Sequence, residues 1–218
     1  MAKKQVRVSC ANLGIVQIGE YYAMLKSKGS AVPKYSAIGG HSKTSKKVKE
    51  FLQYKCDAKF EENSDDLILY IPKSKINHFR SWYKKRMGRD NLDDELREEL
   101  TEENSILKTL EGLTSEYMTT DETIAKSTRK GSNGELTYYF IDIYEVKLTD
   151  DQEDSMLNYA AAGDTLALLT KEELSLKHYN GAQLQADCIN KYVDQYEDPF
   201  DDLESSIMNG LDTVYEDL

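Results

Sequence analysis

The chain has 218 residues, a length that fits one domain with an elaboration or two small domains. Apolar residues make up 39% of it, which is enough for a core. No apolar run approaches the length of a membrane span and no signal-peptide core is present, so we expect a cytoplasmic protein without membrane contact. The three cysteines are scattered and form no Cys-x-x-Cys pair, which argues against a disulfide framework or a structural zinc site.

Charge is distributed unevenly along the chain. Residues 1–90 contain 19 Lys and Arg against 8 Asp and Glu, whereas residues 91–218 contain 9 against 31. This asymmetry indicates a basic surface that attracts phosphates and an acidic surface that holds cations or repels nucleic acid. The alternative that the two halves neutralise each other across an interface stays open.

The first half of the chain predicts strands followed by a basic helical segment. Residues 5–27 read as two strands or one bent hairpin, and residues 35–38 as a short strand that stops at Gly39-Gly40. Residues 43–58 and 74–86 each predict a lysine-rich helix with one apolar face. Between them lies an apolar strand, residues 67–71, which Pro72 ends.

A Glu-rich helix follows, capped by Asp90 or Asn91 and running to about Glu103. Glu99, Glu102 and Glu103 are spaced i, i+3 and i+4, so a helix places them on one face. Carboxylates this close repel one another unless a cation such as Mg²⁺ neutralises them. The alternative, a solvated acidic face, stays open at this point.

The second half predicts a long strand over residues 135–148, with residues 113–118 as its partner. We expect an acidic loop at 150–154, a strand at 166–169 and a helix at 183–196. Thr170-Lys-Glu-Glu-Leu174 begins like a capped helix. The tail, residues 197–218, carries eight acidic residues and no Lys or Arg.

In this order the segments resemble a Nudix domain over roughly residues 5–195. Residues 98–106 lie on the second half of the family signature, Arg-Glu-hydrophobic-x-Glu-Glu-x-Gly-hydrophobic. Gly39-Gly40 resembles the Pro-Gly-Gly that opens the signature, and Asp90 falls where its first Glu would be. The resemblance implies an α/β fold of the α+β type, a Nudix-like α/β/α sandwich with a mixed sheet. It divides the chain into a Nudix-like domain (1–196), an insertion within it (about 41–88) and an acidic tail (197–218).

The resemblance also has departures. Nearly fifty residues separate Gly40 from Asp90, where the family has only a few. The family's Arg is Glu98 here, which removes the salt bridge that normally orients its neighbours, and the family's later Gly is Ser105.

The resemblance implies a metal-dependent hydrolase that cleaves the pyrophosphate linkage of a nucleoside diphosphate-linked compound, with Mg²⁺ or Mn²⁺ as cofactor. The implied catalytic residues are Glu99 and Glu102; the implied metal ligands are the Gly39 carbonyl, Glu99, Glu102 and Glu103, with Glu153 or Asp154 as a later acid; His41, Lys43 and Arg86 are the candidate substrate-binding residues.

Two other functions stay open. A degenerate Nudix domain that senses a nucleotide without cleaving it is favoured by Glu98 and by the insertion. An interaction protein is favoured by the charge asymmetry. We expect a nucleotide-like small molecule as partner, with a homodimer and nucleic-acid or protein contact through the basic insertion as alternatives. Trp82 and Tyr83 would either stack on a base or pack the insertion onto the domain.

Overall fold

The structure is a computed structural model, which describes residues 4–27, 32–61, 64–86, 92–127 and 134–193. Asp90 and the acidic tail therefore lie outside the described residues. Among the described residues, no helix is long and apolar enough to cross a membrane.

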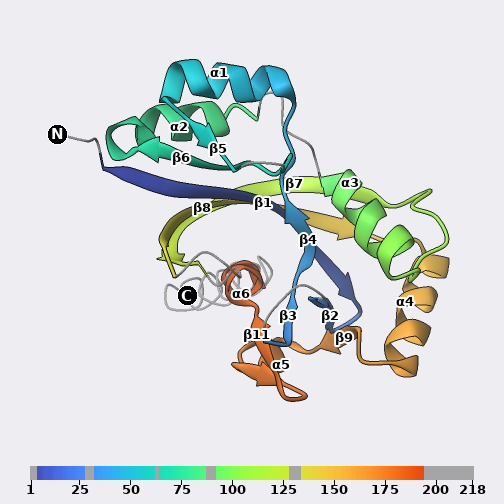
Figure 1. Ribbon diagram of the computed structural model, residues 1–218. Helices are drawn as coiled ribbons and strands as arrows, with labels where there is room; N and C mark the ends of the chain where they lie inside the picture. The colour runs from blue at the N-terminus through green and yellow to red at the C-terminus, as the bar shows by residue number, and fades with distance from the viewer. Residues whose placement is uncertain (1–3, 28–31, 62–63, 87–91, 128–133, 194–218) are drawn as a thin grey trace, which may run out of the picture.

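A mixed β-sheet is organised around one long strand, β1 (Gln5–Ile18) (Figure 1). β1 pairs in parallel with β8 (Leu136–Lys147) and antiparallel with β6 (Ile68–Pro72), β4 (Ile38–His41) and β2 (Tyr21–Lys26). The outer edge of β8 is covered by β7 (Thr114–Lys126), which is as long as β8. The other strands are short: β3 (Lys34–Ser36), β5 (Lys59–Phe60), β9 (Leu166–Leu169), β10 (His178–Tyr179) and β11 (Ala182–Gln185). The predicted pairing of residues 113–118 with the long strand is confirmed, and the partner strand continues beyond them to Lys126.

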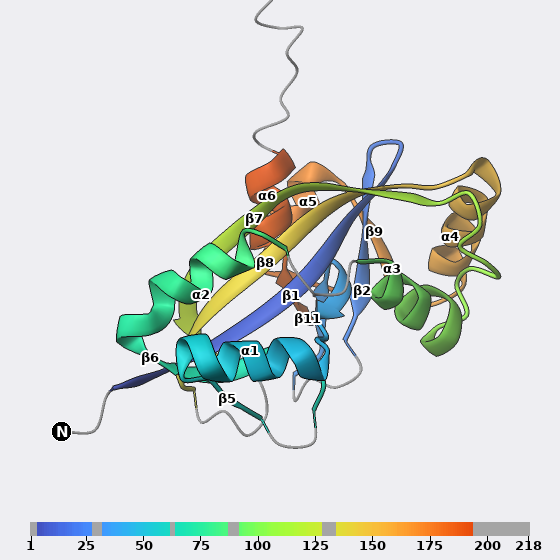
Figure 2. The same cartoon turned by 90° about the horizontal axis from the view of Figure 1, so that it is seen from above.

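Helices cover both faces of this sheet (Figures 1 and 2). Alternate residues of β1 point to opposite faces. Val8 and Cys10 belong to the apolar cluster formed with the insertion helices, whereas Ile15 belongs to the cluster on the other face. The helices are α1 (Lys46–Cys56), α2 (Ile76–Tyr83), α3 (Leu92–Leu96), α4 (Asp150–Ala162), α5 (Lys171–Leu174) and α6 (Asp187–Val193). The α/β/α layering expected from the sequence is confirmed.

Three apolar clusters fill the space between the layers. One joins α1 and α2 to β1, β6 and β8; a second joins α3 and α4 to the C-terminal halves of β1 and β8; the third lies under α5 and α6. The first two lie on the same face of the sheet, because both take residues of even number from β1 and β8.

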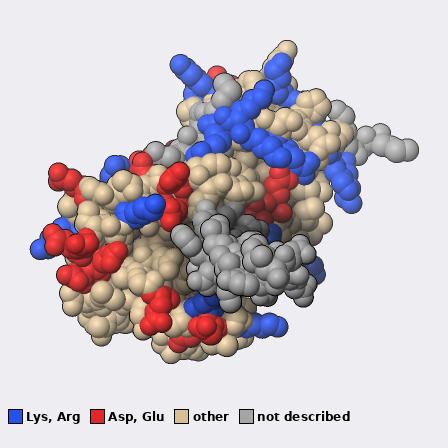
Figure 3. Space-filling model, turned by 180° about the vertical axis from the view of Figure 1, so that it is seen from behind, with Lys and Arg blue, Asp and Glu red and all other residues tan. Residues whose placement is uncertain are grey.

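The insertion is integrated into the fold of the domain. Its strand β6 pairs directly with β1, and its short helix η1 (Lys73–Lys75) leads into α2. Ser45 caps α1 by accepting a hydrogen bond from the backbone N–H of Val48. Lys and Arg gather over this end of the molecule, whereas Asp and Glu predominate over the other end (Figure 3).

The acidic loop expected at residues 150–154 is wrong, because α4 begins at Asp150. Thr149 and Gln152 form a capping box, in which each side chain bonds the other residue's backbone N–H. Acidic residues in a first helical turn are favoured by the helix dipole.

Two further boundaries differ from the sequence predictions. Residues 183–185 lie in β11, which pairs in parallel with β3, so the last helix begins only at Asp187. Gly39 and Gly40 do not end a strand but lie inside β4, paired with β1.

Candidate functional site

A band of buried polar residues separates two of the apolar clusters, on the face of the sheet that α1, α2, α3 and α4 cover. On β1, Asn12 is fully buried, between Cys10 of one cluster and the region under α3. On β8, Asp142 is 1% exposed, between Phe140 and Tyr144, which belong to the two clusters. The register pairs Asn12 with Asp142, and paired residues of neighbouring strands share a face. A carboxylate is therefore held at the centre of the sheet.

Helix α3 brings a second carboxylate to this band. Leu92, Leu96 and Leu100 recur every four residues and are fully buried, so they fix the helix on the sheet. Glu95 is turned toward β4 and is only 5% exposed. A Cβ on Gly40 would lie 2.1 Å from Glu95 Oε2. Glycine at position 40 is therefore what makes room for the Glu95 carboxylate.

Glu99 lies one turn after Glu95 and contacts the other glycine of the pair. Its Oε2 accepts a hydrogen bond of 2.6 Å from the backbone N–H of Gly39. Burial raises the pKa of Glu99 to about 8; the hydrogen bond opposes this shift, and the charges of Glu95, Glu103 and Glu98 add to it. Several carboxylates thus compete for one small volume, which is an arrangement that a cation stabilises.

Lys43 supplies one positive charge to this acidic group. It forms an ion pair with Glu98, and its Nζ lies 3.9 Å from Glu95 Oε1. The hydrogen bond to Glu98 raises the pKa of Lys43. Lys43 and Glu98 are each 41% exposed, so this side of the group meets solvent. We use the term acidic group below for Glu95, Glu98 and Glu99.

Arg86 supplies a second positive charge, at Asp142. Its guanidinium carbon lies 3.9 Å from the centre of the Tyr117 ring, and its Nη2 donates to Tyr144 Oη at 2.6 Å. Its Nε lies 3.9 Å from Asp142 Oδ2, while Thr120 donates to Asp142 Oδ1 at 2.7 Å. Arg86 is thereby fixed by two aromatic rings, and one side of it faces a buried carboxylate.

The helix that carries the acidic group changes its winding there. After Leu96 it continues as a π-helix, η2 (Arg97–Glu103). Asn104 closes the wide last turn by donating from Nδ2 to the Glu99 carbonyl at 2.7 Å. Ser105 then takes a left-handed conformation with φ of 53°, at the position where the resemblance has glycine. π-turns are rare and occur frequently at functional sites.

The predicted site residues are only partly brought together. Gly39 contacts Glu99, Lys43 reaches the neighbouring Glu95 and Glu98, and Glu103 is close enough to raise the pKa of Glu99. Glu102 is exposed and is not among the groups that shift Glu99, so its predicted role stays a prediction. Gly39 contacts Glu99 through its N–H, and its carbonyl as a metal ligand also stays a prediction.

The remaining predicted residues lie elsewhere. His41 ends β4, half-buried and paired with Ala11. Glu153 and Asp154 lie in the first half of α4. Tyr83 is fully buried and donates to the Phe140 carbonyl. Of its two predicted roles, stacking on a base or packing the insertion onto the domain, the structure shows the packing role.

Glu95 and Asp142 were not predicted. The sequence contains a signal for each: Glu95, Glu98 and Glu99 repeat the i, i+3, i+4 spacing one turn earlier, and Asp142 interrupts an apolar strand.

In the described part of the chain, no group of three or more His, Cys, Asp or Glu side chains is arranged as it stands to hold a metal ion. The donor chemistry nevertheless suits a hard divalent cation, because carboxylate oxygens converge beside a glycine that leaves room for them. Lys43 provides positive charge to the same oxygens.

Comparison with known families gives one match. The model of the SMODS-associated NUDIX domain matches residues 5–191, which is most of the chain. Neither the curated proteins nor the solved structures gave a match.

Proposed function

The chain belongs to the family of SMODS-associated NUDIX domains, and we propose on this basis that it hydrolyses the pyrophosphate linkage of a nucleoside diphosphate-linked compound, using Mg²⁺ or Mn²⁺. NUDIX domains generally use divalent metals. The observation that carries the proposal is the placement of Glu95 against Gly40 and of Glu99 against Gly39, with Glu98 beside them on Lys43. These three side chains would hold the metal, with Glu102, Glu103 and the Gly39 carbonyl as further candidates.

A bound divalent ion would neutralise phosphate oxygens and make a bound water more acidic. The chain's own residues supply the rest. Glu99 Oε2 is engaged by Gly39, which leaves Oε1 to take a proton from water. A bound cation would favour the charged form of Glu99, which is the form that accepts a proton. Lys43 is positioned to contact a substrate phosphate, since it lies at the exposed side of the acidic group.

The test compares two neighbouring turns of one helix. Hydrolysis is measured with Mg²⁺ and Mn²⁺ across a panel of nucleoside diphosphate-linked compounds, using Glu98→Gln, Glu99→Gln and, from the next turn, Glu102→Gln. We expect the first two variants to lose about 10²- to 10⁴-fold in turnover, as for loss of a catalytic acid or base. Glu102→Gln decides between two ligand sets: its turnover stays near that of the parent if Glu95, Glu98 and Glu99 hold the metal, and falls with that of Glu99→Gln if Glu99, Glu102 and Glu103 hold it.

The outcomes separate the assignments. If turnover is lost in Glu102→Gln but retained in Glu98→Gln, the metal ligands lie one turn later and are Glu99, Glu102 and Glu103. Full turnover in Glu99→Gln would contradict the catalytic proposal in either form, because Glu99 belongs to both sets. Melting temperatures of all three variants exclude misfolding as the cause.

A second candidate function is a nucleotide sensor without hydrolysis. The Lys43–Glu98 ion pair favours it, because it neutralises the acidic group without a metal. A nucleotide that raises the melting temperature, and is recovered unchanged after incubation with Mg²⁺ or Mn²⁺, would support the sensor and contradict hydrolysis of that compound.

A further inference from the structure

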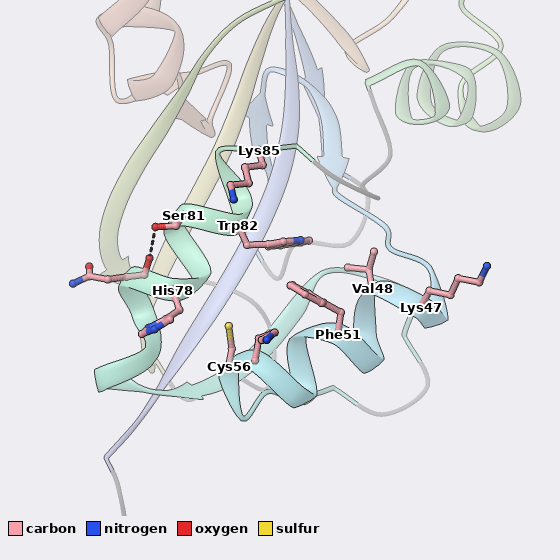
Figure 4. A pocket seen from close by; sticks show the side chains of 10 residues that line it. Lys47, Val48, Phe51, Cys56, His78, Ser81, Trp82 and Lys85 are labelled. Carbon is pink, nitrogen blue, oxygen red and sulfur yellow. Dashed lines mark hydrogen bonds between the residues drawn. The ribbon is translucent and has the colours of Figure 1, made fainter.

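A groove lies between the two insertion helices, away from the acidic group (Figure 4). Its volume is about 580 Å³, within the range of small-molecule sites, roughly 300–1,000 Å³. It is lined from α1 by Lys47, Val48, Phe51, Lys55 and Cys56, and from α2 and its end by Asn77, His78, Ser81, Trp82 and Lys85.

The floor of the groove is apolar and aromatic. Phe51 projects from α1 toward Trp82 of α2 (Figure 4). Phe51 is 42% exposed, which is unusual for a phenylalanine and leaves part of its side chain open to a ligand. Trp82 is 8% exposed, so an edge of the indole completes the floor. This apolar area fits a single aromatic ring, and it is too small for the several anchors of an amphipathic helix.

The rim of the groove is basic. Lys47, Lys55 and Lys85 are all exposed, and among the described residues none of them lies within ion-pair distance of a carboxylate. Three unneutralised amines around a pocket attract an anion. Asn77 and His78, both exposed, add polar groups at one end.

From these features we propose that the groove binds a nucleoside phosphate, with the base on Phe51 against the edge of Trp82 and the phosphates on Lys47, Lys55 and Lys85. The aromatic floor selects the base, and the lysines select the phosphates. This site is separate from the acidic group and needs no metal, so it does not depend on the proposed hydrolysis.

Trp82 is the chain's only tryptophan, so its fluorescence reports the groove directly. The full chain is titrated in EDTA with ADP, adenosine and inorganic pyrophosphate. We expect saturable quenching by ADP, with at least tenfold weaker binding of the other two, because each lacks one half of the contacts.

Variants with neighbouring controls locate the ligand. Phe51→Ala should weaken ADP binding about 5- to 150-fold, the range for loss of one base stack. Lys47→Ala and Lys85→Ala should each weaken it about two- to fivefold, as for an exposed charge pair. The controls Gln53→Ala and Lys46→Ala lie on α1 outside the groove and should leave the affinity unchanged.

Four results would overturn the proposal. The first is the absence of saturable quenching up to about 5 mM ADP. The second is pyrophosphate that binds as tightly as ADP, which indicates an anion patch, and the third is a single-stranded oligonucleotide that binds far more tightly than ADP, which indicates a nucleic-acid groove. The fourth is ADP binding that is lost in Glu98→Gln but kept in Phe51→Ala, which places the ligand at the acidic group. If Glu98→Gln abolishes hydrolysis yet keeps quenching, both sites stand as separate; quenching without any hydrolysis contradicts only the proposed function.

Discussion

Gly39→Ala is the substitution for which the structure predicts the largest loss of stability at the site. Gly39 has φ of +134°, a conformation that residues with a side chain rarely adopt. An added Cβ would also lie 2.2 Å from the Asn12 carbonyl oxygen and 3.0 Å from Leu13 Cα. Both atoms are backbone of the central strand β1, so they cannot rotate away as a side chain can.

The magnitude follows from these two effects. Strained backbone of this kind costs about 1–3 kcal/mol, and forcing atoms into a packed region about 1–3 kcal/mol more. A total of about 3–5 kcal/mol corresponds to a fall of roughly 6–20 °C in melting temperature for a domain of this size. Thermal unfolding followed by circular dichroism measures it.

Gly163→Ala is the matched control. Gly163 follows α4 in extended backbone, with φ of −159° and no atom within 4 Å of an added Cβ. Its alanine variant should stay within about 0.5 kcal/mol of the parent. If Gly39→Ala melts within about 2 °C of Gly163→Ala, β4 does not pack on β1 as described, and the position of Glu99 beside it loses its support.

Three further outcomes are expected. Gly40→Ala should cost only about 1–2 kcal/mol, because the flexible Glu95 side chain can move from the added Cβ, yet it should weaken Mg²⁺ or Mn²⁺ binding measured by calorimetry; unchanged metal binding would contradict the role of Glu95. Lys43→Gln should lower the melting temperature in EDTA by about 2–4 °C and strengthen Mn²⁺ binding severalfold, since it removes a competing cation from a half-exposed pair; weaker Mn²⁺ binding would show that Lys43 does not compete. Arg7→Met should cost about 1–3 kcal/mol in urea unfolding, because Arg7 is 2% exposed and bonds both Glu61 and Thr137; a cost below about 0.5 kcal/mol would show that Glu61 is solvated without it.

The positions of the strands were predictable because apolar and polar residues alternate locally within them. The alternation over residues 135–148 predicts a half-buried strand, and the structure confirms β8 there. The order of the strands in the sheet, with β1 parallel to β8, depends on contacts between distant segments and was not predicted. The start of α4 also has a local sequence signal, the capping box of Thr149 and Gln152, but four acidic residues in the same segment suggested a loop. Which carboxylates form the site could not be predicted from the local sequence. The spacing i, i+3, i+4 occurs from Glu95 and again from Glu99, and only the packing of Leu92, Leu96 and Leu100 on the sheet decides which turn faces β4.

The two ends of the insertion each carry a cation that the described residues bring to the site. Lys43, just before α1, bonds Glu98, and Arg86, just after α2, faces Asp142. The groove between α1 and α2 is therefore joined to the rest of the domain by the two segments that carry Lys43 and Arg86. Deleting residues 43–87 would remove both positive charges together with the groove, and the buried Asp142 would lose its contact with Arg86. Such a deletion cannot distinguish a role in ligand binding from a role in stability. Single substitutions at Lys47 and Lys43 can, because the first changes only the rim of the groove and the second only the acidic group.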